Sequence, residues 1–264
     1  MAGETRDMGE RVRGRGGVAI AVAVAALLAG RAVAEVAPEE RALLAASNLF
    51  AVVPEQFEAR LTITGSDRNR PMRVRVWRGG RDRLLVQPLE AKQAGRFLLQ
   101  LGADRYLIAP GAREPVKLGA GVALAGAVSA ENVLGLDVER DFDVERVQAE
   151  GRVVTFHLKA RPGTAAARAT PAARWVVDRT TRLPLRVDVV LADGRTARVV
   201  EFAAFTAGRR GVPSRLVLKD TLRGGPPATV EVEAFDAMPV PDALFSLTDG
   251  TARAKLLASP TPSR

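Results

Sequence analysis

The sequence predicts a mostly β protein of the α+β class, in which a curled antiparallel sheet follows one helix and is interrupted by a helical insert. Short segments of alternating apolar and polar residues follow one another along most of the chain, separated by glycine and proline. Helical periodicity is found near the N-terminus, and one apolar, glycine-rich segment interrupts the strands. A sheet of about ten strands has to curl or close, and helices are the natural filler of its concave side.

The N-terminus has the pattern of a secretory signal peptide. Three arginines between residues 11 and 15 precede an apolar run over residues 18–30, which is shorter than the roughly 20 residues that a membrane-spanning helix needs. The small-x-small triplet Ala32-Val33-Ala34 follows, a sequence of the kind that signal peptidase cleaves. We therefore predict a signal peptide over residues 1–34, cleaved after Ala34, with an uncleaved anchor as the alternative. The mature protein is expected to work outside the cytoplasm.

Residues 38–50 predict a short amphipathic helix. A proline followed by two glutamates opens the segment, as is typical of a helix N-terminus. Leu43, Leu44 and Phe50 then fall on one side at helical spacing. This helix is expected to pack through its apolar side.

Apolar residues recur with a period of two on both sides of the insert, which predicts two series of strands. The strands expected before the insert lie at residues 57–64, 72–77, 84–87, 96–101 and 106–108. Those expected after it lie at residues 142–148, 153–160, 175–178, 185–191, 197–205, 215–222 and 229–235. Asp193-Gly194 has the composition of a two-residue hairpin turn.

The insert covers residues 119–136 and is small and apolar, with Glu131 as its one charged residue. It is too rich in glycine for a stable isolated helix and too apolar for an ordinary solvent loop. Two interpretations stay open: a pair of short helices that plugs one end of a barrel, or a mobile apolar lid over a cavity. A single domain is expected over residues 35–247, followed by a disordered tail over residues 248–264.

The composition argues against most kinds of catalytic and metal site. The chain has no cysteine and one histidine, so conventional zinc, haem and iron–sulfur sites lack ligands. No serine stands in a Gly-x-Ser-x-Gly elbow. The histidine, His157, is interpreted as a surface or half-buried polar residue of a strand. The sequence therefore predicts a protein that is not an enzyme and binds no cofactor or metal.

An alternating acidic run is the strongest remaining candidate for chemistry. It consists of Asp137, Glu139, Asp141, Asp143 and Glu145. Several of these carboxylates would share one strand face, as a hydrolase pair or a calcium site requires, but the run lacks the glycine and the ligand order of an EF-hand loop. We interpret it as a solvated strand edge whose charge discourages aggregation.

The net charge of +9 does not predict nucleic-acid binding. Nucleic-acid binders gather basic residues in a patch with aromatic side chains among them. Here the arginines are scattered and aromatic residues make up 5% of the chain. Outside the cytoplasm, such a basic protein is better placed to make transient contact with anionic lipid head groups.

A series of short motifs carries a resemblance to a known family. The motifs are Tyr106–Pro110, the insert from Ser129 to Leu136, the hairpin of Trp175–Asp178 with Leu183–Arg186, and Pro241–Phe245. In their order and spacing, over residues 56–247, the chain resembles the bacterial outer-membrane lipoprotein-sorting protein family, the LolA-like periplasmic carriers.

The resemblance implies a half-open β-barrel closed by helices, with an apolar cavity that shields a lipid or lipoprotein acyl chain in the periplasm. It also implies transfer toward the outer membrane, with an inner-membrane transporter as donor. The expected lipid-binding residues on the strands are Trp77, Leu85, Phe97, Leu99, Leu101, Tyr106 and Ile108. Those expected in the insert are Val122, Leu124, Val128, Val133, Leu134 and Leu136.

Two other functions remain compatible with the sequence. One is a non-enzymatic interaction or sensor module of the cell envelope, which has the same scaffold with a filled interior and binds another protein. The other is an envelope hydrolase that uses the acidic run at residues 137–145. The carrier is the hypothesis that the signal peptide, the apolar insert and the resemblance favour together.

Overall fold

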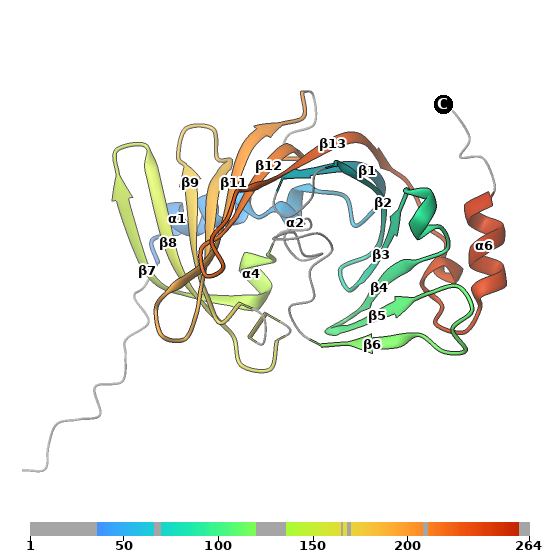
Figure 1. The fold of residues 1–264 in the computed structure, drawn as a ribbon. Helices are drawn as coiled ribbons and strands as arrows, with labels where there is room; N and C mark the ends of the chain where they lie inside the picture. Colours follow the sequence, from blue (N-terminus) through green and yellow to red (C-terminus); the bar gives the residue numbers. More distant parts are fainter. Residues whose placement is uncertain are drawn as a thin grey trace, which may run out of the picture. The chain divides into compact units, whose positions relative to one another are not determined.

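The computed structural model describes residues 36–65, 70–119, 136–164, 166–167, 170–207 and 211–258. The predicted signal peptide and nearly all of the insert lie outside these residues. Thirteen strands form one antiparallel sheet in the order β6-β5-β4-β3-β2-β1-β13-β12-β11-β10-β9-β8-β7 (Figure 1). Because β6 and β7 are its two edges, the sheet is open. The mostly β, antiparallel fold is thus confirmed. The predicted curling of the sheet into a half-open barrel is not, because the sheet is neither closed nor strongly curled.

The strands fall into two meanders that meet where β1 pairs with β13. The first consists of β1 (Gln56–Gly65), β2 (Met72–Gly79), β3 (Arg83–Pro88), β4 (Phe97–Leu101), β5 (Asp104–Ile108) and β6 (Val116–Leu118), with a 3-10 turn η1 (Ala91–Gln93) before β4. The second consists of β7 (Phe142–Glu150), β8 (Val153–Ala160), β9 (Ala172–Asp178), β10 (Pro184–Val190), β11 (Thr196–Phe205), β12 (Pro213–Asp220) and β13 (Ala228–Ala237). Every predicted strand is present, and β6, which is too short to show a period, is additional.

The two faces of the sheet pack against different helices. On one face, here called the inner face, strand side chains form a large core with α1 (Pro38–Ser47), α2 (Leu49–Val52) and α4 (Val138–Asp141). On the opposite or outer face, a smaller cluster packs against the C-terminal segment, which contains η2 (Asp242–Phe245) and α6 (Gly250–Ala258). Figure 1 shows α2 on one side of the sheet and α6 on the other.

The predicted N-terminal helix is broken at Asn48 into α1 and α2. Asn48 is extended, and its side-chain oxygen accepts a hydrogen bond from Phe50 N at 3.2 Å, so it caps α2. At the end of α1, the Trp175 indole N–H donates to Ser47 Oγ at 2.9 Å. This buried bond joins α1 to β9 in the sheet.

The acidic run is divided between a helix and a strand. Asp143 and Glu145 lie on the edge strand β7, as the interpretation of a strand edge requires. That interpretation is wrong for residues 137–141, since Asp137 caps α4 by accepting a hydrogen bond from Arg140 N. A capping aspartate three residues before its partner amide stabilises a helical turn more than a strand end.

The hairpin between β10 and β11 is longer than the sequence predicted. Gly194 N donates to Leu191 O, and Leu191 N donates to Arg195 O, so the loop has three residues. Gly194 has φ of +84°, a conformation that glycine adopts without strain. Asp193-Gly194 is therefore a turn, as predicted, but of the type with an added bulge residue.

The predicted disordered tail is wrong for residues 250–258, which form α6. Arg253 on this helix is buried and donates to the carbonyl oxygens of Leu244 and Ser246. Leu257 packs against the outer cluster. The helix depends on these tertiary contacts, which local sequence does not reveal. None of the helices in the described ranges has the length and hydropathy of a transmembrane span.

Candidate functional site

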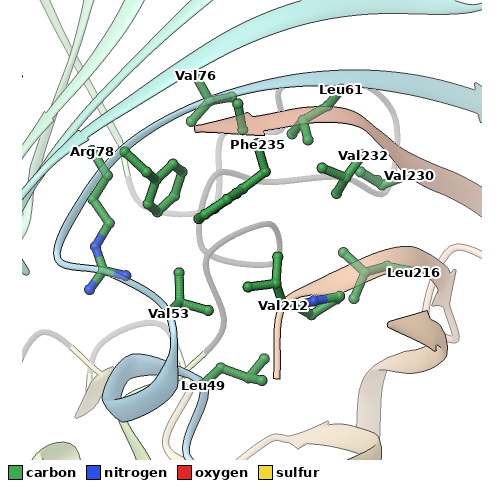
Figure 2. Close-up of a pocket in the computed structure, with 13 residues that line it drawn as sticks. Leu49, Val53, Leu61, Val76, Arg78, Val212, Leu216, Val230, Val232 and Phe235 are labelled. Atoms are coloured by element: carbon green, nitrogen blue, oxygen red, sulfur yellow. The ribbon is translucent and has the colours of Figure 1, made fainter. Parts of the chain in front are cut away.

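A pocket of about 50 Å³ lies on the inner face, between α2 and the four adjacent strands β2, β1, β13 and β12 (Figure 2). We call it the inner pocket. Its lining residues are Leu49, Val53, Phe57, Ala59, Leu61, Val76, Arg78, Val212, Pro213, Leu216, Val230, Val232 and Phe235. All of them except Arg78 are apolar, so the pocket favours a hydrocarbon guest.

Strand alternation and one β-bulge explain why the lining residues of β1 and β13 all face the pocket. On β1 the lining residues occupy every second position, which directs them to one face. On β13 the register shifts opposite Arg60 and Leu61, which leaves Glu233 as an extra residue. The bulge turns Phe235 to the same face as Val230 and Val232. Its ring then lies 4.8 Å, between centroids, from that of Phe57.

Helix α2 closes the pocket from the other side and lies very close to the turn before β12. Leu49 and Val53 reach the pocket from this short helix and its C-cap. Gly211 has φ of +81°, and a Cβ atom built on it would overlap with Val52 Cγ2. Only glycine therefore fits at residue 211 while α2 keeps this position.

Arg78 is the one charged residue of the lining and is 1% exposed. Its Nε donates to Gly80 O at 3.0 Å, and its guanidinium carbon lies 4.1 Å from the centre of the Phe50 ring. Its Nη2 has no hydrogen-bond partner among the described residues. Burial lowers the pKa of Arg78 to about 10, against the opposing charges of Glu55 and Asp137. The side chain is therefore still protonated at neutral pH.

A polar network beside Arg78 connects three chain segments. Asp137 is buried and accepts hydrogen bonds from Asn48 Nδ2 at 3.0 Å and from Arg81 Nη1 at 3.1 Å. Arg140 binds Asp141 through Nε at 2.8 Å. These bonds hold the cap of α2, the turn between β2 and β3, and the start of α4 together.

The seven strand residues predicted to bind lipid lie together, but on the outer face. Trp77, Leu85 and Leu99 are buried there, with Phe97, Leu101, Tyr106 and Ile108 packed around them. The alternation that brings Val76 to the inner face turns Trp77 to the opposite one. Lipid contact by these seven residues stays a prediction, and none of them lines the inner pocket.

The outer cluster is covered by the C-terminal segment. Val240, Leu244 and Phe245 pack against it, and a Cβ atom on Gly79 would overlap with the ring of Phe245. At the margin of the cluster, Trp77 Nε1 donates to Glu58 Oε2 at 3.0 Å, so the indole N–H has a hydrogen-bond acceptor. In this structure the apolar surface of the cluster is used in contacts within the chain.

Of the six insert residues predicted to bind lipid, the structure describes only Leu136. Leu136 is half-buried and packs against the inner core. The other predicted contacts, Val122, Leu124, Val128, Val133 and Leu134, lie outside the described residues, and so does any lid that they form.

His157 lies on the outer face of β8, as a half-buried polar residue. Its Nε2 is 2.9 Å from Arg146 Nη2. Burial lowers the pKa of His157, and the charges of Arg146 and Arg174 act in the same direction. In the part of the chain that the structure describes, no three His, Cys, Asp or Glu residues are grouped so that they could hold a metal ion.

The lining of the inner pocket was not predicted from the sequence. Phe57, Leu61, Val230 and Leu216 were recognised as strand residues, but alternation does not say which face a ligand uses. The one available indication was Arg78, a charged residue in register with Val74 and Val76 on the apolar side of β2. A charged residue on the apolar side of a strand is unusual, and apolar packing does not explain it.

Comparison with known proteins supports the resemblance at the level of the fold. No protein-family profile and no curated protein matches the chain. Among solved structures, a LolA superfamily protein from Nitrosomonas europaea matches with a TM-score of 0.65 and 17% identity, over 78% of this chain and 96% of that one. A putative outer membrane lipoprotein-sorting protein domain from Vibrio parahaemolyticus matches with a TM-score of 0.58 and 12% identity, over 82% and 96%.

A third solved structure is also similar to this chain. A DUF1329 family protein from Desulfovibrio piger matches with a TM-score of 0.61 and 14% identity, over 78% of this chain and 96% of that one. All three matches cover nearly the whole of the compared chain. The protein therefore has a LolA-like fold, and the predicted resemblance is confirmed to that extent.

Proposed function

We propose that this protein, with its LolA-like fold, is a carrier that binds an acyl chain of a lipid or lipoprotein in the inner pocket. The observation that carries the proposal is the lining of that pocket, in which twelve of thirteen residues are apolar. The pocket lies between the sheet and α2, where the half-open barrel implied by the resemblance would have its cavity. A carrier needs no catalytic residue, only an apolar interior that opens.

The volume of the pocket requires that it opens to bind. Pockets that hold drug-sized ligands measure about 300–1,000 Å³, whereas the inner pocket measures about 50 Å³. Helix α2 is the element that would move, because it is a single turn held by a few apolar side chains and a cap. The role of the insert at residues 119–136 as a lid stays a prediction from the sequence.

Burial of an acyl chain would supply free energy for opening the pocket. Each methylene group that leaves water contributes roughly 0.8 kcal/mol. A 16-carbon chain would thus gain on the order of 10 kcal/mol before the costs of ordering the chain and moving α2. This gain would favour an acyl chain in the pocket over one exposed to water.

The rest of the proposed cycle follows from the N-terminal sequence and the resemblance. The signal peptide at residues 1–34 would export the chain to the periplasm and be cleaved after Ala34. An inner-membrane transporter would load the acyl chain, and transient contact with the outer membrane would release it. The surplus of basic residues would assist contact with anionic lipid.

Native mass spectrometry and a binding assay test the proposal together. Mild purification should yield a complex with co-purified lipid, and the delipidated protein should take up a fluorescent fatty acid. Val232→Trp fills the pocket from a half-buried position and should weaken this uptake tenfold or more. Val116→Trp is the matched control, since Val116 is exposed on β6. Absence of lipid and of uptake in the wild-type protein would contradict a carrier.

A second candidate function is an interaction or sensor module on the same scaffold. The small volume of the pocket favours it, because a filled interior is what such a module would have. The module would bind another envelope protein and no acyl chain. Recovery of a stoichiometric protein partner, together with no lipid uptake, would select this function over the carrier.

A further inference from the structure

We infer that Arg78 binds the oxyanion of the guest, so that the carrier selects a single-chain amphiphile with a carboxylate or phosphate head. The inference deepens the proposed function and rests on it. The observation behind it is a buried guanidinium, at the margin of an otherwise apolar pocket, whose Nη2 has no hydrogen-bond partner in the described part of the chain.

The donor inventory of Arg78 leaves room for an acceptor. A guanidinium carries five N–H groups, and burying such a donor unpaired is costly. Nε donates to Gly80 O, while Nη2 donates to no described residue. Phe50 stacks on the guanidinium and offers no hydrogen-bond acceptor in its plane. A bound carboxylate or phosphate would satisfy the remaining donors and offset the buried charge.

The carboxylates nearest to Arg78 are engaged elsewhere. Asp137 accepts hydrogen bonds from Asn48 and Arg81, and Glu55 lies 3.6 Å from Arg81 Nε. Both lower the electrostatic cost of the buried cation without a hydrogen bond to it. The guanidinium is thus held charged in place, which is the arrangement expected of an anion-binding group.

The position of Arg78 also orients the guest. Figure 2 shows Arg78 at one end of the pocket, with Leu216, Val230 and Val232 at the other. An amphiphile whose head meets Arg78 would direct its chain toward β12 and β13. A neutral acyl chain would gain the same apolar contacts but leave Nη2 without a partner.

The test compares head groups on one chain length. Palmitate, hexadecyl phosphate and hexadecanol are each titrated against the delipidated full-length mature protein, with displacement of the neutral fluorophore N-phenyl-1-naphthylamine as readout. A charge-assisted hydrogen bond predicts that the two anions bind about tenfold tighter than hexadecanol. Arg78→Met should abolish this preference, so that the two anions and hexadecanol bind with equal affinity. Arg73→Met, an exposed arginine of the same strand, should change none of the three affinities.

The outcomes separate this inference from the proposed function. Equal binding of palmitate and hexadecanol by the wild-type protein would overturn the inference while the carrier stands, and this comparison needs no variant to fold. Equal weakening of all three probes by Arg78→Met would also overturn it. Binding of none of the probes would reject the carrier itself. Binding of inorganic phosphate that is lost in Arg78→Met, together with equal binding of palmitate and hexadecanol, would assign Arg78 to a free anion and exclude the amphiphile.

Discussion

Trp175 joins helix α1 to the sheet through a single buried hydrogen bond. The side chain is fully buried, and its N–H donates to Ser47 Oγ. Ser47→Ala leaves this donor without an acceptor, so we expect a loss of about 1–3 kcal/mol of unfolding free energy. Urea denaturation of the wild type, Ser47→Ala, Trp175→Phe and the double variant measures the coupling. Additive losses in the two single variants would contradict a direct bond.

The contacts of Asp178 make the folding stability of the protein depend on pH in the acid range. Its carboxylate accepts hydrogen bonds from Thr180 N and Thr181 N and faces Arg152 Nε at 3.2 Å. The backbone bond from Thr181, ahead of the other contacts, lowers the pKa of Asp178 below its ordinary value of 3.8. A carboxyl group with a lowered folded-state pKa stabilises the fold above pH 3.8, and that contribution is lost as the pH falls through the folded-state value.

Asp178→Asn should therefore destabilise the protein at pH 7. The difference in unfolding free energy between the wild type and this variant should become smaller as the pH falls. Denaturant midpoints of both proteins between pH 7 and pH 2 measure the difference. Asp236→Asn is the control, because Asp236 is exposed on β13, and the gap between its stability and that of the wild type should stay small across the whole pH range. A pH-independent gap between the wild type and Asp178→Asn would contradict the assignment.

Helix α2 and the turn before β12 are in contact at one glycine. Gly211→Ala forces a Cβ into the space of Val52 and imposes a positive φ on alanine, so we expect a loss of at least about 1 kcal/mol. Val52→Ala in the same chain should recover the steric part of that loss. Thermal unfolding of both variants measures it, and no recovery in the double variant would show that α2 does not lie against Gly211.

Helix α6 covers the outer cluster, so its removal has a visible consequence. Truncation after Leu247 removes Arg253 and Leu257 and should expose the side of the cluster around Phe97, which increases binding of a hydrophobic dye such as ANS. Truncation after Ala258 keeps α6 and is the matched control. Equal dye binding by the two truncated proteins would contradict the docking of α6.

At the scale of helices and strands, sequence alternation and turn residues were enough to predict the strands. They were not enough to predict the bulge and the helix break that shape the site. The bulge at Glu233 and the break at Asn48 each depend on partners far away in the sequence. The helix at residues 250–258 was missed because its stability comes from Arg253 and Leu257 docking on other elements. Local propensity carries no information on such contacts.

The whole molecule was predicted correctly in class and resemblance, while the binding face was not resolved. The strands β2–β4 are apolar on both faces: Val74, Val76 and Val86 point inward, and Trp77 and Leu85 point outward. Periodicity says that the two sets are opposite but does not say which set meets a helix and which a ligand. Only the packed structure shows that α6 occupies one face and that a pocket remains on the other.

Photo-crosslinking tests the binding face most directly. Palmitate with a diazirine at its methyl end is bound to the mature protein, irradiated, and the labelled peptides are identified by mass spectrometry. The inner pocket predicts label on the peptides of β12 and β13, at residues such as Leu216 and Val230. Label confined to β3–β5, around Leu85 and Leu99, or no label at all, would contradict acyl-chain binding in the inner pocket.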